Sequence, residues 1–302
     1  EVDWLRRYSD PTAGAVRQAV SRALGVPPDW VLVGNGSDDL LTMIVRACLE
    51  PGNTVVYPTP TYTLYRVLAR IQAAECVEIP YDDDYRLPLE ALIAAQGTVT
   101  MIASPNSPSG TAIPLATLET LVSQATGLVV IDEAYADFAE ENALGLVARY
   151  PHVIVLRTLS KGYSLAGLRL GFAIAQPSLL EQLGKVKDSY NVDAIACAMG
   201  AAAIADQDYK NATAAQVKVD RAILTAGLEQ LGCRVWPSQA NFVLTQPPRN
   251  AAAALYQSLK AQDILVRYFD QPRLADKLRI TVGTASQNQA VIQAIAAGLT
   301  QD

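Results

Sequence analysis

Short β-branched runs that alternate with amphipathic stretches restrict most strongly how this chain can fold. The runs are TVVYP (54–58), TVTMIAS (98–104), LVVIDE (128–133), VIVLRT (153–158) and GFAIA (171–175). Helix-like stretches lie among them, near 37–49, 61–73, 88–96, 114–125 and 177–188. Strands that alternate with helices of this length are typical of a mainly parallel sheet covered on both faces. The sequence therefore predicts a three-layer α/β unit.

The alternation ends in the last third of the chain. A long helical stretch from about 209 to 231 is followed by CRVWP, ANFVLT, a helix from 250 to 262, ILVRYF, LRITVG and a final helix. Ser286 and Gln289 have the spacing of a capping box at the start of this final helix. We expect a large domain over residues 32–210 and a smaller α+β domain over residues 211–302. The N-terminal segment 1–31 is expected to belong to the smaller domain, and its helix near 12–24 either packs with that domain or bridges to it.

Composition and charge exclude several classes of function. Half of the 302 residues are hydrophobic and 18% are charged, which is typical of a packed globular protein. The net charge of −6 disfavours a general binder of nucleic acid or anionic membranes, because such binders need an excess of Lys and Arg. No apolar run approaches the ~20 residues of a membrane span, and the first residues resemble neither a signal nor a transit peptide. We therefore expect a cytoplasmic protein.

The cysteines and the single histidine argue against metal and triad chemistry. Cys48, Cys76, Cys197 and Cys233 are far apart among apolar neighbours, which predicts reduced core residues. His152 precedes the strand VIVLRT, where a structural role is expected. With one histidine and no CxxC pair, neither a zinc site nor a Ser-His-Asp triad is expected. We predict no metal site.

Polar side chains stand where two of the predicted strands end. Gly36, Ser37 and Asp38 follow the strand WVLVG at the start of a helix, whose free N–H groups suit a phosphate. Ser37 could equally be an ordinary N-cap. Asp132 ends the strand LVVID, and Tyr135 follows it. A carboxylate at an apolar strand end is costly to bury alone, so we expect a cationic partner for Asp132.

A third segment, RTLSKGYSLAGLRLG (157–171), adds cations. It places Thr158, Ser160 and Lys161 after a strand and Arg169 eight positions after the lysine. Two hydroxyls and a guanidinium form an anion site, and a lysine in a low-dielectric crevice can attack a carbonyl, although a lone loop lysine is more often a solvated charge. These groups together match pyridoxal 5'-phosphate (PLP). They offer a cradle for its phosphate, a carboxylate for its pyridine nitrogen, a phenol for its ring hydroxyl and an amine for its aldehyde.

Ten ordered segments resemble the fold-type I aminotransferases, and among them the histidinol-phosphate aminotransferase family. They are RYSDPTA, GNGSDDLL, PTPTYTLY, SPNSPSG, DEAYADF, RTLSKGYSLAGLRLG, DSYNVDA, QANFVL, ILVRYF and LRITVGT. The resemblance covers nearly the whole chain and implies an αβα large domain of the aspartate aminotransferase type. It also implies PLP as cofactor and transamination of histidinol phosphate or imidazole-acetol phosphate with glutamate or 2-oxoglutarate, in histidine biosynthesis.

Other functions on the same fold remain alternatives. An aromatic amino-acid aminotransferase would need only a small change in the substrate pocket, and a threonine-phosphate decarboxylase shares the scaffold. A regulatory protein built on a retired aminotransferase is disfavoured, because the chain has no room for an added DNA-binding domain and lacks basic charge. The first two alternatives are distinguished from the main hypothesis only by the substrate.

The resemblance also assigns roles to residues. It implies that Lys161 forms a Schiff base with PLP, that Asp132 pairs with the pyridinium nitrogen and that Tyr135 bonds the 3'-oxygen. Tyr62 would stack on the ring, unless it is a packing aromatic. The phosphate would be surrounded by Ser37, Asp38, Thr158, Ser160 and Arg169, beside Gly36. Arg279 would bind the substrate α-carboxylate, with Asn241 and Arg267 on the same side, although Arg267 could instead form a surface ion pair.

The sequence departs from the family pattern in two places. In SPNSPSG the position that usually supplies an asparagine to the 3'-oxygen is Ser107, and we expect Asn106 to reach the ring instead. The family's N-terminal Asn-Glu-Asn-Pro-Tyr arm is not part of this sequence, so substrate residues on it cannot be assigned. Tyr8 resembles the tyrosine that reaches the phosphate of the neighbouring subunit. This implies a homodimer with shared active sites, although Tyr8 could also be a packing aromatic.

Overall fold

A seven-stranded sheet forms the centre of the larger part of the computed structural model, which describes residues 3–300. Its strands are β1 (Val31–Gly34), β2 (Thr54–Thr59), β3 (Glu75–Pro80), β4 (Val99–Ala103), β5 (Leu128–Asp132), β6 (Val153–Thr158) and β7 (Gly171–Ile174). They lie in the order β1-β7-β6-β5-β4-β2-β3, and β7 is antiparallel to both of its neighbours. The other pairs are parallel, so the predicted mainly parallel sheet is confirmed.

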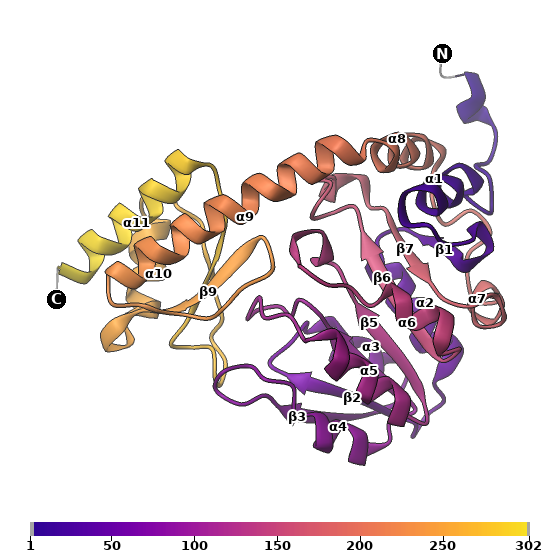
Figure 1. Cartoon of the computed structure of the whole chain (residues 1–302), viewed down its shortest axis with the longest axis horizontal. Coiled ribbons are helices and arrows are strands. Elements are labelled where there is room, and N and C mark those ends of the chain that lie inside the picture. Colours follow the sequence, from indigo (N-terminus) through magenta and orange to yellow (C-terminus); the bar gives the residue numbers. More distant parts are fainter. Residues whose placement is uncertain (1–2, 301–302) are drawn as a thin grey trace.

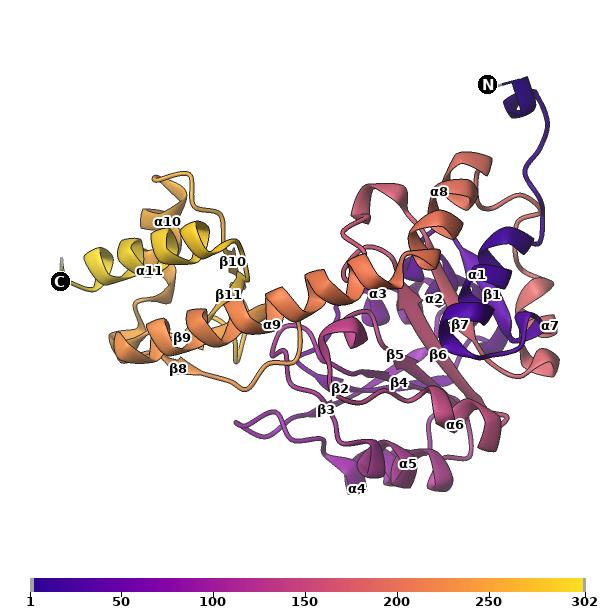
Figure 2. The same ribbon diagram turned by 45° about the horizontal axis from the view of Figure 1, so that its top comes forward.

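Helices cover both faces of this sheet (Figures 1 and 2). The core on one face includes residues of α1 (Gly14–Leu24), α4 (Leu89–Ala95), α5 (Leu115–Gln124), α6 (Leu144–Arg149) and α8 (Ala194–Ala205). The core on the other face includes residues of α2 (Ser37–Cys48), α3 (Leu64–Ile71) and α7 (Pro177–Gly184). The three-layer α/β prediction is therefore confirmed.

The first four residues of β6 show why a central strand of this sheet is apolar. All six residues are buried. Val153 and Val155 point into one core, whereas Ile154 and Leu156 point into the other. Because successive side chains alternate between the faces, a strand covered on both sides needs a continuous apolar run. The polar residues Arg157 and Thr158 therefore mark the carboxyl end of the strand.

A second, antiparallel sheet forms the smaller unit. It contains β8 (Arg234–Val235), β9 (Phe242–Gln246), β10 (Arg267–Tyr268) and β11 (Leu278–Thr281), in the order β10-β11-β9-β8. The helices α10 (Ala252–Lys260) and α11 (Ala285–Thr300) pack with it in a separate core. The predicted α+β organisation of this part agrees with the structure.

Helix α9 (Gln207–Gln230) belongs to both units (Figure 1). It begins beside the 3-10 helix Ala136–Phe138 of the larger unit, and Leu224 and Leu228 near its end lie in the core of the smaller one. The domain boundary expected at residue 210 thus falls inside one continuous helix.

The N-terminal segment does not pack where we expected it. Val16, Ala19 and Val20 form the apolar face of α1, and all three are buried in the core of the larger unit, where α1 contacts α8 and β1. The assignment of residues 1–31 to the smaller domain is therefore corrected for the described part of that segment. Residues 1–2 and 301–302, at the ends of the expected domains, lie outside the described residues.

The capping box of α11 also differs from the prediction. The N–H of Thr284 donates to Oε1 of Gln287 at 2.9 Å, and the N–H of Gln287 donates to Oγ1 of Thr284 at 3.4 Å. The reciprocal pair is therefore Thr284 and Gln287, and the pair Ser286 and Gln289 is wrong. The reason is that α11 begins at Ala285, which places its N-cap two residues earlier than the sequence pattern indicated.

The cysteines and the histidine occupy structural positions. All four cysteines are free, and Cys233 is buried. Nε2 of His152 lies 3.0 Å from the carbonyl oxygen of Val122. Within residues 3–300, no three His, Cys, Asp or Glu side chains gather closely enough to hold a metal ion. Over the same residues, none of the helices combines the length and the apolar character that crossing a membrane requires.

Candidate active site

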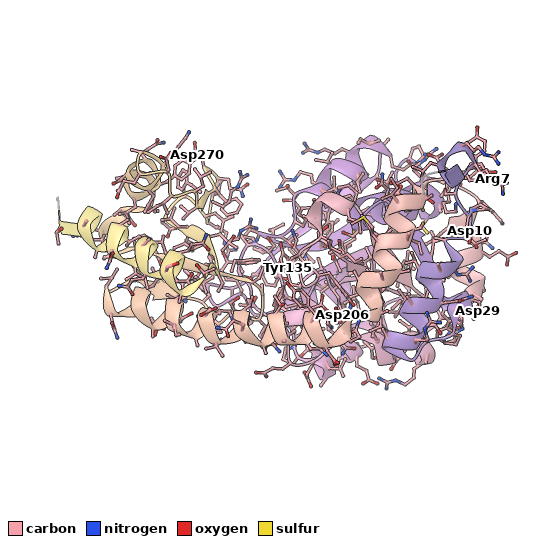
Figure 3. All side chains as sticks on the ribbon, turned by 90° about the horizontal axis from the view of Figure 1, so that it is seen from above. Arg7, Asp10, Asp29, Tyr135, Asp206 and Asp270 are labelled. Carbon is pink, nitrogen blue, oxygen red and sulfur yellow. The ribbon has the colours of Figure 1, made fainter. Side chains whose placement is uncertain are left out.

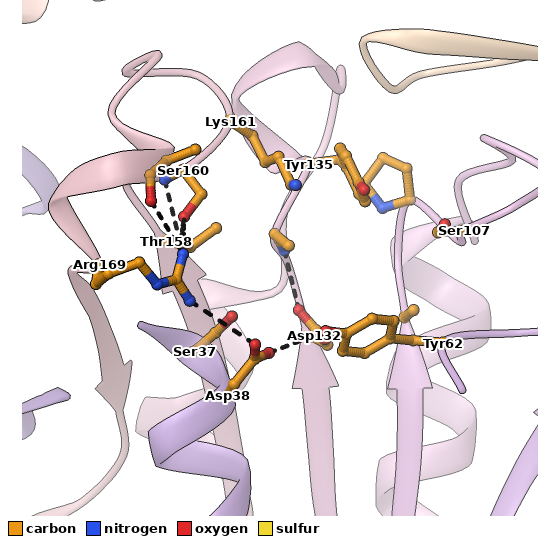
Figure 4. A pocket seen from close by; sticks show the side chains of 14 residues that line it. Ser37, Asp38, Tyr62, Ser107, Asp132, Tyr135, Thr158, Ser160, Lys161 and Arg169 are labelled. Carbon is orange, nitrogen blue, oxygen red and sulfur yellow. Dashed lines mark hydrogen bonds and ion pairs between the residues drawn. The ribbon is translucent and has the colours of Figure 1, made fainter. Parts of the chain in front are cut away.

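A cavity of about 150 Å³ lies at the carboxyl ends of β4, β5 and β6, where ligands bind in open α/β sheets (Figure 4). Most of the predicted cofactor residues line it. The lining consists of Ser37, Asp38, Tyr62, Ala103, Pro105, Ser107, Asp132, Ala134, Tyr135, Thr158, Ser160, Lys161, Ala166 and Arg169. These side chains come from segments far apart in the sequence, which the parallel sheet brings to one edge.

One end of the cavity is built to receive an anion. The helix α2 begins at Ser37, and no side chain caps its N-terminus, so its first N–H groups are available. Gly36 precedes it with φ of 86°, and a Cβ there would lie 2.8 Å from Nη2 of Arg169. The backbone conformation favours glycine here, and a side chain would also push the Arg169 guanidinium away from its place.

Hydroxyl groups and a guanidinium complete this end. Oγ1 of Thr158 donates to Oγ of Ser160 at 3.0 Å. Arg169 donates to the carbonyl oxygen of Ala166 at 3.0 Å, and its Nη2 lies 3.8 Å from Oδ2 of Asp38. With a positive charge, two hydroxyls and free N–H groups side by side, the site can hold a phosphate by charge-assisted hydrogen bonds.

Asp132 lies at the other end of the cavity and is 6% exposed. Its Oδ1 accepts the N–H of Ala134 at 3.1 Å, and its Oδ2 accepts the hydroxyl of Tyr65 at 2.9 Å. Burial raises the pKa of Asp132 to about 6, and the nearby charges of Asp38 and Glu133 raise it too, whereas the two hydrogen bonds lower it. A carboxylate has about four acceptor sites, so two remain for a donor in the cavity.

A buried charge network holds the strand ends beside Asp132. Nε of Arg157 donates to Oε2 of Glu133 at 2.8 Å, and the N–H of Ala143 donates to the other oxygen at 2.5 Å. Asp137 lies 4.0 Å from Arg157 and 3.2 Å from Lys210 on α9. Because burial raises the pKa of Glu133, its ionised form depends on Arg157. The network fixes β5 against β6 and the start of α9.

The amine of Lys161 points into the cavity (Figure 4). Its Nζ lies 5.5 Å from the ring centroid of Tyr135. Burial lowers the pKa of Lys161, and the cations Arg279 and Arg169 lower it further, whereas Asp132 and Asp38 act in the opposite direction. Among the described residues no carboxylate forms an ion pair with this amine within 4.0 Å. A lysine in this state can act as a nucleophile and as a base.

Two arginines of the smaller unit lie near the cavity, since one of them contacts the lining residue Ser107 and the other lies beside it. Arg279 on β11 lies directly opposite Arg267 on β10. Nη1 of Arg279 donates to Oγ of Ser107 at 2.8 Å, and its Cζ lies 4.8 Å from the ring centroid of Phe242. Arg267 lies 5.1 Å from the ring of Phe269. Like charges directly opposite one another are unfavourable, and in the described part of the chain neither arginine has an ion-pair partner. The pair therefore suits an anionic group of a substrate.

The geometry does not support the expectation that Asn106 reaches the cofactor ring. Asn106 is fully buried, and its Oδ1 accepts the hydroxyl of Thr61 at 2.7 Å. Its Nδ2 donates to the carbonyl oxygen of Pro60 at 3.2 Å and to Ser109 at 2.9 Å. These bonds occupy the amide away from the cavity, whereas Ser107 lines it. Ser107 is therefore the better candidate at this position.

Five other predicted residues are not among those that line the cavity: Gly36, Arg267, Arg279, Asn241 and Tyr8. Asn241 lies directly before β9, beside Phe242. Tyr8 is 83% exposed and stacks on Tyr190, with 4.5 Å between the ring centroids. Its neighbour Arg7 lies at the end of the molecule away from Tyr135 (Figure 3). Tyr8 therefore faces outward and does not reach the cavity of its own chain.

Tyr65 is a residue at the site that was not predicted from the sequence. It lies three residues after Tyr62 in PTYTLY, and the ring centroids are 5.8 Å apart with the planes at 89°. In the helix predicted near 61–73, residues three apart would share a face, so a tyrosine at this spacing was the available signal, although α3 itself begins only at Leu64.

Comparisons with known proteins agree with this geometry. The family model for aminotransferase class I and II matches residues 4–295. A histidinol-phosphate aminotransferase 1 of Trichormus variabilis is 59% identical over 293 residues, which are 97% of this chain and 84% of that protein. The histidinol-phosphate aminotransferase of Rhodopirellula baltica is 44% identical over 288 residues, which are 95% of this chain and 80% of that protein.

Solved structures show the same likeness. A histidinol-phosphate aminotransferase from Sinorhizobium meliloti, in complex with pyridoxal-5'-phosphate, has a TM-score of 0.92 at 28% identity and covers 98% of this chain and 83% of its own. An L-threonine-O-3-phosphate decarboxylase from Porphyromonas gingivalis has a TM-score of 0.85 at 22% identity, covering 99% and 93%. The second likeness concerns the fold alone, so the fold does not separate these reactions.

Proposed function

The chain belongs to the class I and II aminotransferases, and we propose that it transfers the amino group between glutamate and imidazole-acetol phosphate, giving 2-oxoglutarate and histidinol phosphate. The protein is an aminotransferase of histidine biosynthesis with PLP as its cofactor. The observation that carries the proposal is that the amine of Lys161 and the carboxylate of Asp132 enter one cavity that ends in a phosphate site.

The side chains around the cavity fit PLP. The Gly36 turn, the N-terminus of α2 and Arg169 would hold its phosphate. Asp132, with two free acceptor sites, would hold its ring nitrogen. When bound, PLP supplies an aldehyde that takes up the amino group and a conjugated ring that accommodates the charge left when a proton is removed.

The residues of the chain then bind, orient and move protons. The lowered pKa of Lys161 increases the fraction of neutral amine near neutral pH, so the amine can accept the proton from the substrate carbon that carries the amino group. Ionised Asp132 would keep a proton on the ring nitrogen by a charge-assisted hydrogen bond. The hydroxyls of Tyr135 and Ser107 would hold the ring oxygen of PLP. Ser107 is itself held by a hydrogen bond from Arg279 of the smaller unit.

The paired arginines match both substrates. Glutamate carries a carboxylate on the carbon that bears the amine, and histidinol phosphate carries a phosphate one carbon further away. Arg279 and Arg267 present two positive charges side by side against two aromatic rings. Relatives over nearly the whole chain are histidinol-phosphate aminotransferases, so the aromatic aminotransferase and the decarboxylase are not favoured.

A substitution and a substrate panel test this function. Lys161→Ala should remove the absorption band of lysine-bound PLP and lower turnover by about 10²–10⁴-fold or more. Lys260→Ala, at an exposed position of α10, is the matched control and should retain both. The purified protein should use histidinol phosphate in preference to phenylalanine and threonine phosphate. Full turnover by the Lys161 variant, or a preference for another member of the panel, would reject the proposal.

The outer surface near the N-terminus supports a homodimer with shared active sites, which we also propose. The sequence of α8, AIACAMGAAAIA, is apolar all round, and its outward residues Ile195 and Met199 are 47% and 51% exposed. Tyr8 and Tyr190 add a stacked aromatic pair that also faces outward. A helix of this kind is ordinarily covered on all sides, so a second copy of the chain is a fitting partner.

Mixing two inactive variants tests the sharing of sites. Light scattering should give a dimer. If Tyr8 completes the neighbour's site, Tyr8→Ala and Lys161→Ala subunits should together form hybrid dimers with one intact site each. Random mixing would restore about a quarter of the sites. A monomer, or a mixture with no more activity than its components, would refute the shared site.

A cytoplasmic location remains part of the proposal. The four free cysteines are compatible with it, because thiols stay reduced in that compartment.

A further inference from the structure

Tyr65 has no part in the function described above, yet it touches the site. It lies in α3, its side chain is fully buried, and its hydroxyl donates to Oδ2 of Asp132 at 2.9 Å. Among the described residues, Asp132 is the only hydrogen-bond partner of this hydroxyl. A buried phenol hydroxyl is costly without a partner, and phenylalanine would fill the same space without that cost. We therefore expect the hydroxyl of Tyr65 to have a role at Asp132.

The bond fixes the orientation of the carboxylate. Oδ2 accepts from Tyr65, and Oδ1 accepts from the N–H of Ala134 at 3.1 Å. One donor on each oxygen prevents the carboxylate from rotating, whereas the Ala134 bond alone would allow it. The remaining acceptor site on each oxygen is left for a donor in the cavity that Asp132 lines.

The ring of Tyr65 also supports Tyr62. The two rings are perpendicular, at 89°, with centroids 5.8 Å apart, which is a favourable edge-to-face contact. The hydroxyl of Tyr62 donates to Oδ1 of Asp38 at 3.1 Å, so Tyr62 is held at its ring and at its hydroxyl. Tyr65 thus contacts both the residue expected to stack on the cofactor ring and the residue expected to hold its nitrogen.

The groups around Asp132 make the hydroxyl of Tyr65 important for keeping the carboxylate of Asp132 ionised. The titratable groups that face Asp132 are Tyr65, Tyr62, Asp38, Glu133, Tyr135 and Lys161. Lys161 is the one cation in this set, and Tyr65 is the one side chain in it that donates a hydrogen bond to the carboxylate. Without that bond, burial and the two neighbouring carboxylates would favour the protonated form of Asp132.

We propose that Tyr65 is a positioning residue that orients Asp132, favours its ionised form for the ring nitrogen of PLP, and supports Tyr62 from behind. The proposal rests on the proposed function in taking PLP as the ligand. It concerns how tightly, and over which pH range, the chain holds that ligand.

Titration of the purified protein with PLP tests the proposal through binding. Tyr65→Phe keeps the ring and removes the hydroxyl. It should weaken PLP binding about tenfold at pH 8, since a hydrogen bond to a charged group is lost. The loss should be larger at pH 6, because burial already raises the pKa of Asp132 to about 6 and the variant raises it further. A packing defect would not depend on pH in this way.

Tyr57→Phe is the matched control. Tyr57 is buried and packs against Tyr65 with 6.0 Å between ring centroids, but its hydroxyl donates to Oε1 of Glu78 at 2.8 Å. This variant should bind PLP within about twofold of the wild type at both pH values. An equal loss in both variants would mean that Tyr65 acts only through packing, which would overturn the proposal.

A double-mutant cycle tests whether Tyr65 acts through Asp132. The Tyr65→Phe change should cost little further PLP affinity in an Asp132→Asn background. Additive losses, or wild-type affinity in Tyr65→Phe, would refute the positioning role. Should Tyr65→Phe fail to fold, 3-fluorotyrosine at position 65 keeps the packing and strengthens the donor, so PLP should bind more tightly at pH 6, and unchanged binding would refute the role. Neither result affects the test of Lys161, so the two proposals fail independently.

Discussion

Replacing Asp132 with asparagine should stabilise the protein when PLP is left out. Burial raises the pKa of Asp132 from 3.8 to about 6 in the folded state. Between these two values the folded chain binds more protons than the unfolded chain, so stability falls as the pH rises through this interval and then stays constant. The ionised carboxylate is therefore a destabilising group at neutral pH, and asparagine carries no charge.

The size of the effect follows from this interval and from the hydrogen bonds. The difference between 3.8 and about 6 corresponds to about 3 kcal/mol, at about 1.4 kcal/mol per pH unit. Asparagine has a single carbonyl oxygen, so either Tyr65 or Ala134 loses its acceptor, which costs about 1 kcal/mol. We therefore expect Asp132→Asn to raise the free energy of unfolding by about 2 kcal/mol at pH 8. The gain should disappear at about pH 4.5, where the penalty for the charge has fallen to about 1 kcal/mol and only offsets the lost hydrogen bond.

Urea unfolding without PLP, at one protein concentration and at pH 4.5, 6 and 8, measures this difference. Asp270→Asn, at an exposed position, is the control and should change the free energy of unfolding by no more than about 0.5 kcal/mol. Adding PLP should reverse the order of stability, because the wild type binds it more tightly. If Asp132→Asn is less stable than the wild type by the same amount at all three pH values, burial of the ionised carboxylate does not destabilise the protein, and the reasoning is wrong.

Three further changes probe other parts of the structure. Arg157→Met should lower the free energy of unfolding by about 3–5 kcal/mol, because it leaves Glu133 buried without its cation, and an unchanged urea midpoint would contradict this. Tyr81→Phe should be neutral or slightly stabilising, because the buried hydroxyl of Tyr81 has no hydrogen-bond partner in the described structure; a loss above about 1 kcal/mol in urea unfolding would argue against it. Gly36→Ala should weaken PLP binding roughly tenfold in a PLP titration, because the added methyl would lie 2.8 Å from the Arg169 guanidinium and the backbone φ of 86° disfavours alanine; equal affinity would show that the cradle tolerates a side chain.

The central strands could be predicted from the sequence because both of their faces are buried. In β4 and β6 every residue is buried, and the resulting apolar runs are unmistakable. The edge strand β3 has partly exposed side chains on both faces, so ECVEIP carries no clear strand pattern. The position of α1 could not be predicted either, because an apolar stripe shows that a helix packs but not which core it packs against.

Site residues could be predicted from the sequence where the chemistry needs one residue type at the end of a strand. Asp132 ends a buried strand, Lys161 follows one, and Arg169 precedes the antiparallel strand β7, so the sheet brings all three to one edge. The exchange between Asn106 and Ser107 was not predictable, because both are small polar residues and only the path of the turn decides which one is buried. Tyr65 escaped notice for a related reason, since a buried tyrosine resembles any core residue until the partner of its hydroxyl is known.

The continuous helix α9 has a mechanical consequence for substrate binding. Its 24 residues extend about 36 Å, from the loop network at Asp137 to the core of the smaller unit. A tilt of only about 5° at its beginning would displace its far end by about 3 Å. Such a displacement is enough to break the hydrogen bond between Arg279 and Ser107, so the angle of this helix sets how closely the smaller unit approaches the cavity.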